Sequence, residues 1–213
     1  MKKPAQISSA VIKRLPRYRR FLRDLLRDGV DRVSSGKLGE LTGYTASQIR
    51  QDFNNFGGFG QQGYGYNVQD LYDSITEILG LGAERHMVIV GAGNLGRALA
   101  GFPWKLRDGF IIDGIFDNSP DAIGQKVGAF TVKDLAGLKA HLKKNTPDVG
   151  VITTNRLGAQ EACNILVEGG AKGIWNFAPA NLKLPKGIPL QYVHLNDSLH
   201  ELVYRITEEE AAR

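Results

Sequence analysis

Residues 86–100 constrain the fold more than any other stretch, because an apolar run leads directly into Gly91, Gly93 and Gly96. The spacing Gly-x-Gly-x-x-Gly between a strand and a helix is typical of a dinucleotide-binding loop. The first glycine permits a tight turn, the second lets the backbone approach a pyrophosphate, and the third lets the helix pack against the strand. The helix N-terminus would then face the phosphates. The predicted pyrophosphate site consists of Gly91, Ala92, Gly93, Asn94, Leu95 and Gly96.

The spacing alone is weak evidence in a chain with 26 glycines, but Asp117 strengthens it. This residue ends the next apolar run, 21 positions after Gly96, where the motif places a carboxylate that binds a ribose 2′-hydroxyl. A carboxylate there would repel a 2′-phosphate, which favours NAD(H) over NADP(H). The alternative is that Asp117 only begins the turn of residues 117–120, whose composition suits a turn.

The pattern from residue 87 onward alternates strands with helices, which predicts an α/β fold of the Rossmann type with a doubly wound parallel sheet. In such sheets the ligand lies beyond the carboxyl ends of the strands. Thr153, Thr154, Asn176, Ala178 and Pro179 are therefore expected to flank the nicotinamide, although these segments could also be ordinary turns. The expected strands are 87–90, 110–116, 129–132, 149–153, 173–176 and 190–193, and the expected helices are 94–100, 133–145 and 158–169.

The charge is concentrated at one end of the chain. The net charge is +5, and residues 1–66 carry 12 Lys or Arg against 5 Asp or Glu, whereas residues 67–213 carry 15 against 17. A basic N-terminal module for a polyanion joined to a near-neutral second module fits this distribution.

The composition also indicates where in the cell the protein acts. No apolar run reaches the length of a membrane span, and the basic N-terminus lacks the apolar segment of a secretion signal. We therefore expect a cytoplasmic protein. Cys163 is the only cysteine, so neither an intrachain disulfide nor a cysteine-based metal site is expected.

The basic module has the pattern of a helix-turn-helix. Residues 8–28 have helical periodicity, with the main run expected to start at Pro16 because proline disrupts a helix interior. A second short helix follows Ser34–Ser35, and Thr45 caps a third helix at 46–54. The third helix turns Ile49 and Phe53 inward, so it is the expected recognition helix in a major groove. Its outward residues are Ser47, Gln48, Arg50 and Gln51.

A glycine-rich segment, 56–66, follows the third helix. A flexible linker is one interpretation. Its place after a recognition helix favours a two-stranded wing that enters a minor groove, with Gln61 and Gln62 at the tip. The aromatic residues are expected to anchor this hairpin to the helices; they are Phe56, Phe59, Tyr64 and Tyr66. A capped helix begins after Asn67, and 80–82 is the expected domain boundary.

The last helix is expected to run from a cap at Asn196 or Asp197 to about residue 210. The sheet is already covered by other helices in this scheme, so the apolar stripe of the last helix would pack against a second copy of the chain, as an exchanged arm. An ordinary last helix of the Rossmann domain is the alternative. The stripe consists of Leu195, Leu199, Leu202, Val203 and Ile206.

Catalytic groups are missing where a dehydrogenase needs them. None of His86, His141, His194 and His200 follows a strand at the ligand edge, whereas hydride transfer normally uses an acid or base beside the nicotinamide. We therefore expect no catalytic residue, no small-molecule substrate and no metal site, with the dinucleotide acting as an effector of a DNA-binding protein.

These features together resemble the bacterial redox-sensing repressors of the Rex family, over nearly the whole chain. The resemblance implies a homodimer that binds an inverted-repeat operator with NAD⁺ or without cofactor and releases it when NADH accumulates. It also implies a C-terminal helix exchanged between subunits. The matching segments are 14–18, 33–35, 48–53, 56–66, 91–97, 116–117 and 175–179.

The resemblance assigns roles at the matched positions. Arg50, with Ser47 and Gln48, would read base edges, residues 63–66 would form the wing, and Asp117 would hold the adenosine ribose. The expected DNA-contacting set is Arg14, Arg17, Lys37, Ser47, Gln48, Arg50, Gln51, Gln61, Gln62, Gly63, Tyr64, Gly65 and Tyr66. The expected domains are a winged helix at 1–82, a Rossmann domain at 83–195 and a dimerisation helix at 196–213.

Some positions depart from the family pattern. Gln51 stands where a lysine is usual, and Gln61 and Gln62 replace a basic wing tip, which should flatten the salt dependence of DNA binding. His194 stands where an acidic residue often precedes the last helix, so either Asp197 takes that role or the interdomain lock is built differently. Two other functions stay open: a small NAD-dependent oxidoreductase, and a transcription factor that senses coenzyme A or another adenine nucleotide.

Overall fold

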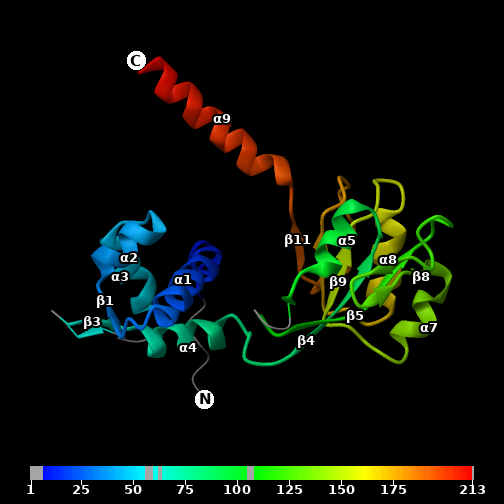
Figure 1. Ribbon diagram of the computed structural model, residues 1–213, viewed down its shortest axis with the longest axis horizontal. Helices are drawn as coiled ribbons and strands as arrows, with labels where there is room; N and C mark the ends of the chain where they lie inside the picture. Colours follow the sequence, from blue (N-terminus) through cyan, green and yellow to red (C-terminus); the bar gives the residue numbers. More distant parts are fainter. Residues whose placement is uncertain (1–6, 56–59, 62–63, 105–107, 213) are drawn as a thin grey trace. The chain divides into compact units, whose positions relative to one another are not determined.

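The computed structural model describes residues 7–55, 60–61, 64–104 and 108–212. The chain divides into two compact units, residues 1–83 and 84–213, so the division lies one residue from the boundary expected at 82. Figure 1 shows the elements of both units. Each unit has its own apolar core. None of the helices in the described ranges has both the length and the apolar character that a bilayer span needs.

The first unit is a winged helix-turn-helix. Ser34, Thr45 and Asn67 cap its second, third and fourth helices, each accepting a hydrogen bond from the N–H three residues further on, as expected of short polar residues at N-caps. Its elements are α1 (Ser9–Arg27), β1 (Arg32–Val33), α2 (Ser35–Thr42), α3 (Ala46–Asn54), β2 (Gly60–Gln61), β3 (Gly65–Asn67) and α4 (Val68–Ile78).

The wing is an antiparallel pair of β2 and β3, and β1 adds a strand on the other side of β3. The sequence predicted the pair but not β1, because a two-residue strand carries no periodicity. Tyr66 is buried and packs edge-on against Phe53, with ring centroids 5.1 Å apart, so its expected anchoring role is confirmed. Tyr64 is 70% exposed, so its expected anchoring is wrong. Phe56, Phe59, Gln62 and Gly63 lie outside the described residues.

The first helix starts earlier than expected. α1 begins at Ser9 and includes Pro16 as an interior residue, so the helical periodicity of residues 8–28 is confirmed and the expected start of the main run at Pro16 is wrong. Interior proline costs a helix about 3 kcal/mol, but Val11 and Leu15 on the first two turns are buried in the core. Their burial, at about 1.5–3 kcal/mol for each large side chain, offsets that cost.

The second unit is built on a parallel sheet with the strand order β11-β10-β9-β4-β5-β8. Residues alternate along β4, so Val88 and Val90 join the core under α7 and α8, while Met87 and Ile89 join the core that includes Ala100 of α5. Helices therefore cover both faces, and the doubly wound prediction is confirmed. The elements are β4 (Arg85–Val90), α5 (Asn94–Gly101), β5 (Phe110–Asp117), β8 (Lys133–Asp134), α7 (Leu138–Leu142), β9 (Val149–Ile152), α8 (Ala159–Glu168), β10 (Gly173–Asn176) and β11 (Leu190–Tyr192).

The segment between β5 and α7 corrects two predictions. The strand expected at 129–132 is β7 (Phe130–Thr131), which pairs with β6 (Lys126–Val127) in a separate hairpin. The sheet is instead extended by β8, at the start of the helix expected at 133–145. That helix is reduced to a 3₁₀ turn, Leu135–Gly137, and the five residues of α7. Short elements of two or three residues are too brief for hydrophobic periodicity to separate them.

The last helix, α9 (Leu195–Ala211), follows β11 (Figure 1) and is exposed along its whole length. His194 occupies its N-cap without a side-chain hydrogen bond, so the prediction of a cap at Asn196 or Asp197 is wrong. The contacts place α9 in the second unit and not in a separate one. None of its stripe residues is covered within the described chain: Leu195, Leu199, Leu202, Val203 and Ile206 are 47–65% exposed.

Candidate cofactor cavity and nucleic-acid interface

The glycine-rich loop joins β4 to α5 and has the geometry that the motif predicts. Gly91 has a φ of +107°, and a Cβ there would lie 2.7 Å from the backbone carbon of Thr153, so only glycine fits. A Cβ on Gly96 would clash with the carbonyl oxygen of Gly91, which confirms its role in helix–strand packing. By contrast, a Cβ on Gly93 would meet nothing within 4 Å. The space beside Gly93 is therefore open for a ligand.

Thr153 holds this loop against the neighbouring strand. Its hydroxyl donates to the carbonyl oxygens of Gly91, at 2.8 Å, and Val90, at 3.2 Å. Thr153 follows β9, which pairs with β4. The hydroxyl thus positions the loop from the next strand along the sheet.

Asp117 forms the turn considered for it and also contacts the glycine loop, while a hydrogen bond with a ribose stays a prediction. Its Oδ2 accepts a hydrogen bond from the backbone N–H of Ala92 at 2.5 Å, and its Oδ1 accepts one from Ser119 at 2.8 Å. The second bond forms the turn, and the first ties the end of β5 to the glycine loop. The carboxylate also lines the cavity beside the loop, where a ribose diol would have to bind.

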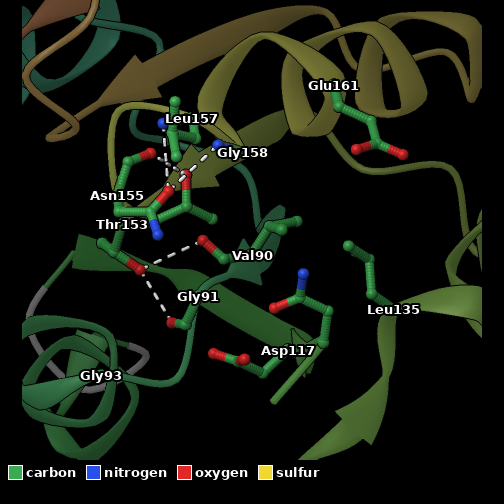
Figure 2. Close-up of a pocket in the computed structure, with 12 residues that line it drawn as sticks. Val90, Gly91, Gly93, Asp117, Leu135, Thr153, Asn155, Leu157, Gly158 and Glu161 are labelled. Atoms are coloured by element: carbon green, nitrogen blue, oxygen red, sulfur yellow. Dashed lines mark hydrogen bonds between the residues drawn. The ribbon is translucent and has the colours of Figure 1, made fainter.

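The cavity at the carboxyl ends of β4, β5 and β9 has a volume of about 430 Å³ (Figure 2). Five residues expected at a cofactor site line it: Gly91, Gly93, Asp117, Thr153 and Thr154. The sequence did not identify Leu135 or Glu161 as lining residues. Leu135 follows β8 and Glu161 lies in the helix that follows β9. Their position after strands that end at this edge was the only sequence feature that could have pointed to them. The remaining lining residues are Val90, Asn118, Asn155, Leu157 and Gly158.

Other expected cofactor residues lie outside the cavity lining. Asn176 is fully buried, and its amide donates to the carbonyl oxygens of Ala178 and Ala180 while accepting from the N–H of Ala178. This side chain stabilises the turn after β10. Ala178 is buried and Pro179 is exposed, and a contact of either with nicotinamide stays a prediction. Within the loop and α5, Ala92, Asn94, Leu95 and Gly96 are likewise not among the residues that line the cavity.

The recognition helix α3 presents exposed polar residues on one side. Ser47, Arg50 and Gln51 are exposed, and Arg50 donates from Nη1 to the Ser35 hydroxyl at 3.0 Å. This bond directs the guanidinium toward the N-terminus of α2. The three side chains lie on the surface of the unit, and their contacts with DNA stay predictions.

Arg14 and Gln48 are engaged inside the domain instead. Arg14 forms a bidentate ion pair with buried Asp52, at 2.6 and 2.7 Å, and Gln48 donates to the same carboxylate at 2.9 Å. The Tyr18 hydroxyl donates to it at 2.7 Å. Burial alone would raise the pKa of Asp52, but the hydrogen bonds from these three side chains and the charge of Arg14 outweigh it and lower the pKa. The expected DNA contacts of Arg14 and Gln48 stay predictions, and they would compete with this network.

The arginine run of α1 is divided between the core and the surface. Arg19 is 8% exposed and donates to the hydroxyls of Thr76 and Tyr72 on α4, a structural role that the sequence pattern did not indicate. Arg17 is exposed and lies over the Tyr44 ring at 5.3 Å. Lys37 is exposed and pairs with Glu40 at 2.9 Å. Arg17 and Lys37 are thus placed on the surface, where their expected phosphate contacts are possible.

The wing contributes backbone geometry as well as side chains. Gly65 has a φ of +71°, and a Cβ there would lie 2.7 Å from the carbonyl oxygen of Val33. Arg32 donates to the Tyr64 carbonyl oxygen at 3.4 Å. The predicted contact of Gln61 with DNA concerns a side chain outside the described ones.

Family models match both units. Residues 6–54 match the family described as "Putative DNA-binding protein N-terminus", and residues 83–180 match the family described as "CoA binding domain". Over 204 residues the chain is 52% identical to the redox-sensing transcriptional repressor Rex of Clostridium perfringens, covering 96% of each protein. The chain belongs to the Rex family of redox-sensing transcriptional repressors. The Rex proteins of Clostridium tetani and Thermoanaerobacter pseudethanolicus are 49% and 48% identical to it over 210 residues, which are 99% of this chain and 100% and 94% of those proteins.

Solved structures of RSP, a Rex-family repressor, share the fold. One is similar with a TM-score of 0.88 at 45% identity, over 97% of both chains. Two others hold ligands: RSP with β-NADH has a TM-score of 0.88, and RSP with β-NAD⁺ and operator DNA has a TM-score of 0.87 at 48% identity over 97% of this chain and 95% of RSP. Because Rex proteins are named as transcriptional repressors, the expectation of a regulator and not an enzyme is confirmed.

Two positions that depart from the family pattern are defined by the structure. His194 is exposed and stacks on Tyr192, with ring centroids 5.9 Å apart. Asp197 lies in the exposed first turn of α9. Whether either of them serves an interdomain lock stays a prediction.

Proposed function

We propose that this protein is an NADH-responsive repressor, in which a homodimer binds an inverted-repeat operator when NADH is scarce and leaves it when NADH binds. The cavity beside the open face of Gly93 carries this proposal, because it joins the glycine loop to Asp117 in a chain of the Rex family. The complexes of RSP with β-NADH and with β-NAD⁺ and operator DNA support both ligands.

The DNA-binding surface in this proposal is α3 with the wing. Ser47, Arg50 and Gln51 are exposed on α3, in the position from which a recognition helix reads base edges. Residues 61–66 would follow the minor groove. Arg17 and Lys37 would add phosphate contacts that position the helix without reading sequence.

The second copy in the proposed homodimer covers α9. Large exposed apolar patches on a folded protein generally mark interaction sites, and the stripe from Leu195 to Ile206 is such a patch. An exchanged helix would bury it in a symmetric dimer. The family relatives come from bacteria, in which a repressor acts on DNA in the cytoplasm, and we propose that location for this protein.

The effector works by its differential affinity for two states. A ligand that binds both states equally shifts nothing, and reversing a 1:99 equilibrium takes a difference of about 5.5 kcal/mol. NADH and NAD⁺ differ only at the nicotinamide ring. Two cofactor sites per dimer would halve the difference that each site must provide.

The test is a titration of the full-length protein on an operator selected with this protein from random-sequence DNA. NADH is expected to release the operator, and NAD⁺ is expected to leave it bound, both at one fixed salt concentration because DNA affinity depends steeply on salt. Equal release by the two forms would reject the redox-sensor proposal.

The match of residues 83–180 to the CoA-binding family favours a second candidate, a repressor that senses coenzyme A. The 3′-phosphate of coenzyme A would face the Asp117 carboxylate, which is unfavourable, whereas a free ribose diol would donate to it. Thermal shifts with NADH, NAD⁺, NADPH and coenzyme A separate the two, because a ligand raises stability according to its affinity. A shift with NADH that is lost in Asp117→Ala supports the dinucleotide.

A further inference from the structure

The cavity contains a carboxylate without a described partner. Among the described residues that line it, only Asp117 and Glu161 carry a charge, and both are negative. Asp117 already accepts two backbone hydrogen bonds. Glu161 forms no hydrogen bond or ion pair within the part of the chain that the structure describes. Glu161 is exposed, so its carboxylate is solvated in the protein alone and is open to a hydrogen-bond donor of a ligand in the cavity.

The position of Glu161 limits which part of the ligand it can meet. Glu161 lies in the first turn of α8, and Leu135 directly follows β8. Figure 2 shows both on the side of the cavity away from Gly93. If the dinucleotide binds as proposed above, its pyrophosphate lies at Gly91–Gly93 and its adenosine ribose at Asp117. The adenine then continues past Asp117, toward Leu135 and Glu161.

We propose that Glu161 is a specificity-determining residue that accepts a hydrogen bond from the exocyclic 6-amino group of the adenine base. An ionised carboxylate only accepts hydrogen bonds, and the 6-amino group is the donor on an adenine ring. Leu135 offers the flat base an apolar surface on the same side of the cavity. The inference rests on the proposed dinucleotide function, and it predicts discrimination against a base with an oxygen at that position.

The experiment compares NADH with reduced nicotinamide hypoxanthine dinucleotide, in which a carbonyl oxygen replaces the 6-amino group. Calorimetric titration of the full-length protein is expected to give about tenfold tighter binding of NADH, the factor for one hydrogen bond to a charged group. In Glu161→Gln the two ligands should bind about equally, because an amide can donate as well as accept. The quantity compared between the native protein and the variant is the ratio of the affinities for NADH and for the hypoxanthine analogue. Removing a negative charge changes the affinity for both anionic ligands alike, so it leaves this ratio unchanged.

Glu168→Gln is the matched control. Glu168 lies two turns further along α8, is exposed, and pairs with Lys139 outside the cavity lining. This variant makes the same change of charge on the same helix, and it is expected to keep the tenfold ratio. A ratio that fell equally in both variants would contradict the inference.

A second ligand separates the two ends of the dinucleotide. The reduced 3-acetylpyridine analogue lacks the carboxamide amino group of nicotinamide but keeps the adenine. Glu161→Gln is expected to leave its affinity relative to NADH unchanged. If this ratio changes and the hypoxanthine ratio does not, Glu161 meets the nicotinamide end and the inference is wrong. If NADH releases the operator while Glu161→Gln leaves the affinity ratios of both analogues to NADH unchanged, only this inference fails. If no dinucleotide binds to the protein, the proposed function fails as well.

Discussion

α1 and α9 both carry an apolar stripe at helical spacing, but only the stripe of α1 is covered. Leu15, Tyr18 and Leu22 on α1 are fully buried, whereas Leu199 and Leu202 on α9 are more than half exposed. α1 packs against α2 and α4 within its own unit. The comparison teaches that an apolar stripe predicts a buried helix face, but does not tell whether that face packs against the same subunit or against a second one.

A substitution in the covered stripe is expected to have the largest effect on stability. Leu22→Ala should lower the free energy of unfolding by about 3 kcal/mol, because it leaves a cavity in a closed core. Urea denaturation at one protein concentration measures this. Leu199→Ala, on the exposed helix, is the matched control at a protein concentration low enough for the subunits to separate, and an equal loss there would show that α9 is packed within its own subunit as tightly as α1.

Placing a charge on the exposed stripe should act on assembly. Leu202→Asp is expected to weaken self-association by about 2 kcal/mol, the scale of a central interface residue, while the isolated subunit keeps its helical content. Sedimentation equilibrium measures the association, and circular dichroism monitors the fold. If Leu202→Asp lowers the free energy of unfolding but leaves the molar mass from sedimentation unchanged, the apolar stripe of α9 packs against its own subunit.

One tyrosine on each helix sharpens the comparison. Tyr18→Phe should cost about 1–2 kcal/mol, because the buried Asp52 carboxylate loses a hydrogen bond. Tyr204 on α9 also donates to a carboxylate, that of Glu208 at 2.8 Å, but it is 64% exposed. Tyr204→Phe should therefore change stability by less than about 0.5 kcal/mol. Denaturation curves that gave equal losses would contradict the difference in burial.

The smallest expected effect is an acid dependence of the α1–α3 contact. The folded-state pKa of Asp52 is lowered below its ordinary value of 3.8. The ionised Asp52 therefore contributes its full stabilisation at pH values above the ordinary pKa. This stabilisation is lost as the pH falls through the lowered pKa of the folded state. The stability difference between the native protein and Asp52→Asn should shrink between pH 5 and strongly acidic solution. A constant difference would mean that the charge of Asp52 does not matter.

Much of the nucleotide-binding unit was predictable because its signals are local. Gly91 needs a positive φ and Gly96 a close helix contact, and each requirement selects one residue type. The α3 helix was predicted at its observed bounds because Thr45 caps it and Ile49 and Phe53 repeat at helical spacing. β8 and the early start of α1 were missed, since the first is too short for a pattern and the second depends on core packing.

The sequence by itself determined the alternation of strands and helices, the glycine loop, and the presence of an apolar stripe on the last helix, because these depend on backbone conformation and periodicity. Only the tertiary structure decided which charged groups are used internally. Arg14 meets Asp52 across 38 positions of sequence, and Glu161 joins Asp117 at one cavity from a different strand–helix unit. Such partners depend on how separate elements pack, and no local pattern encodes that.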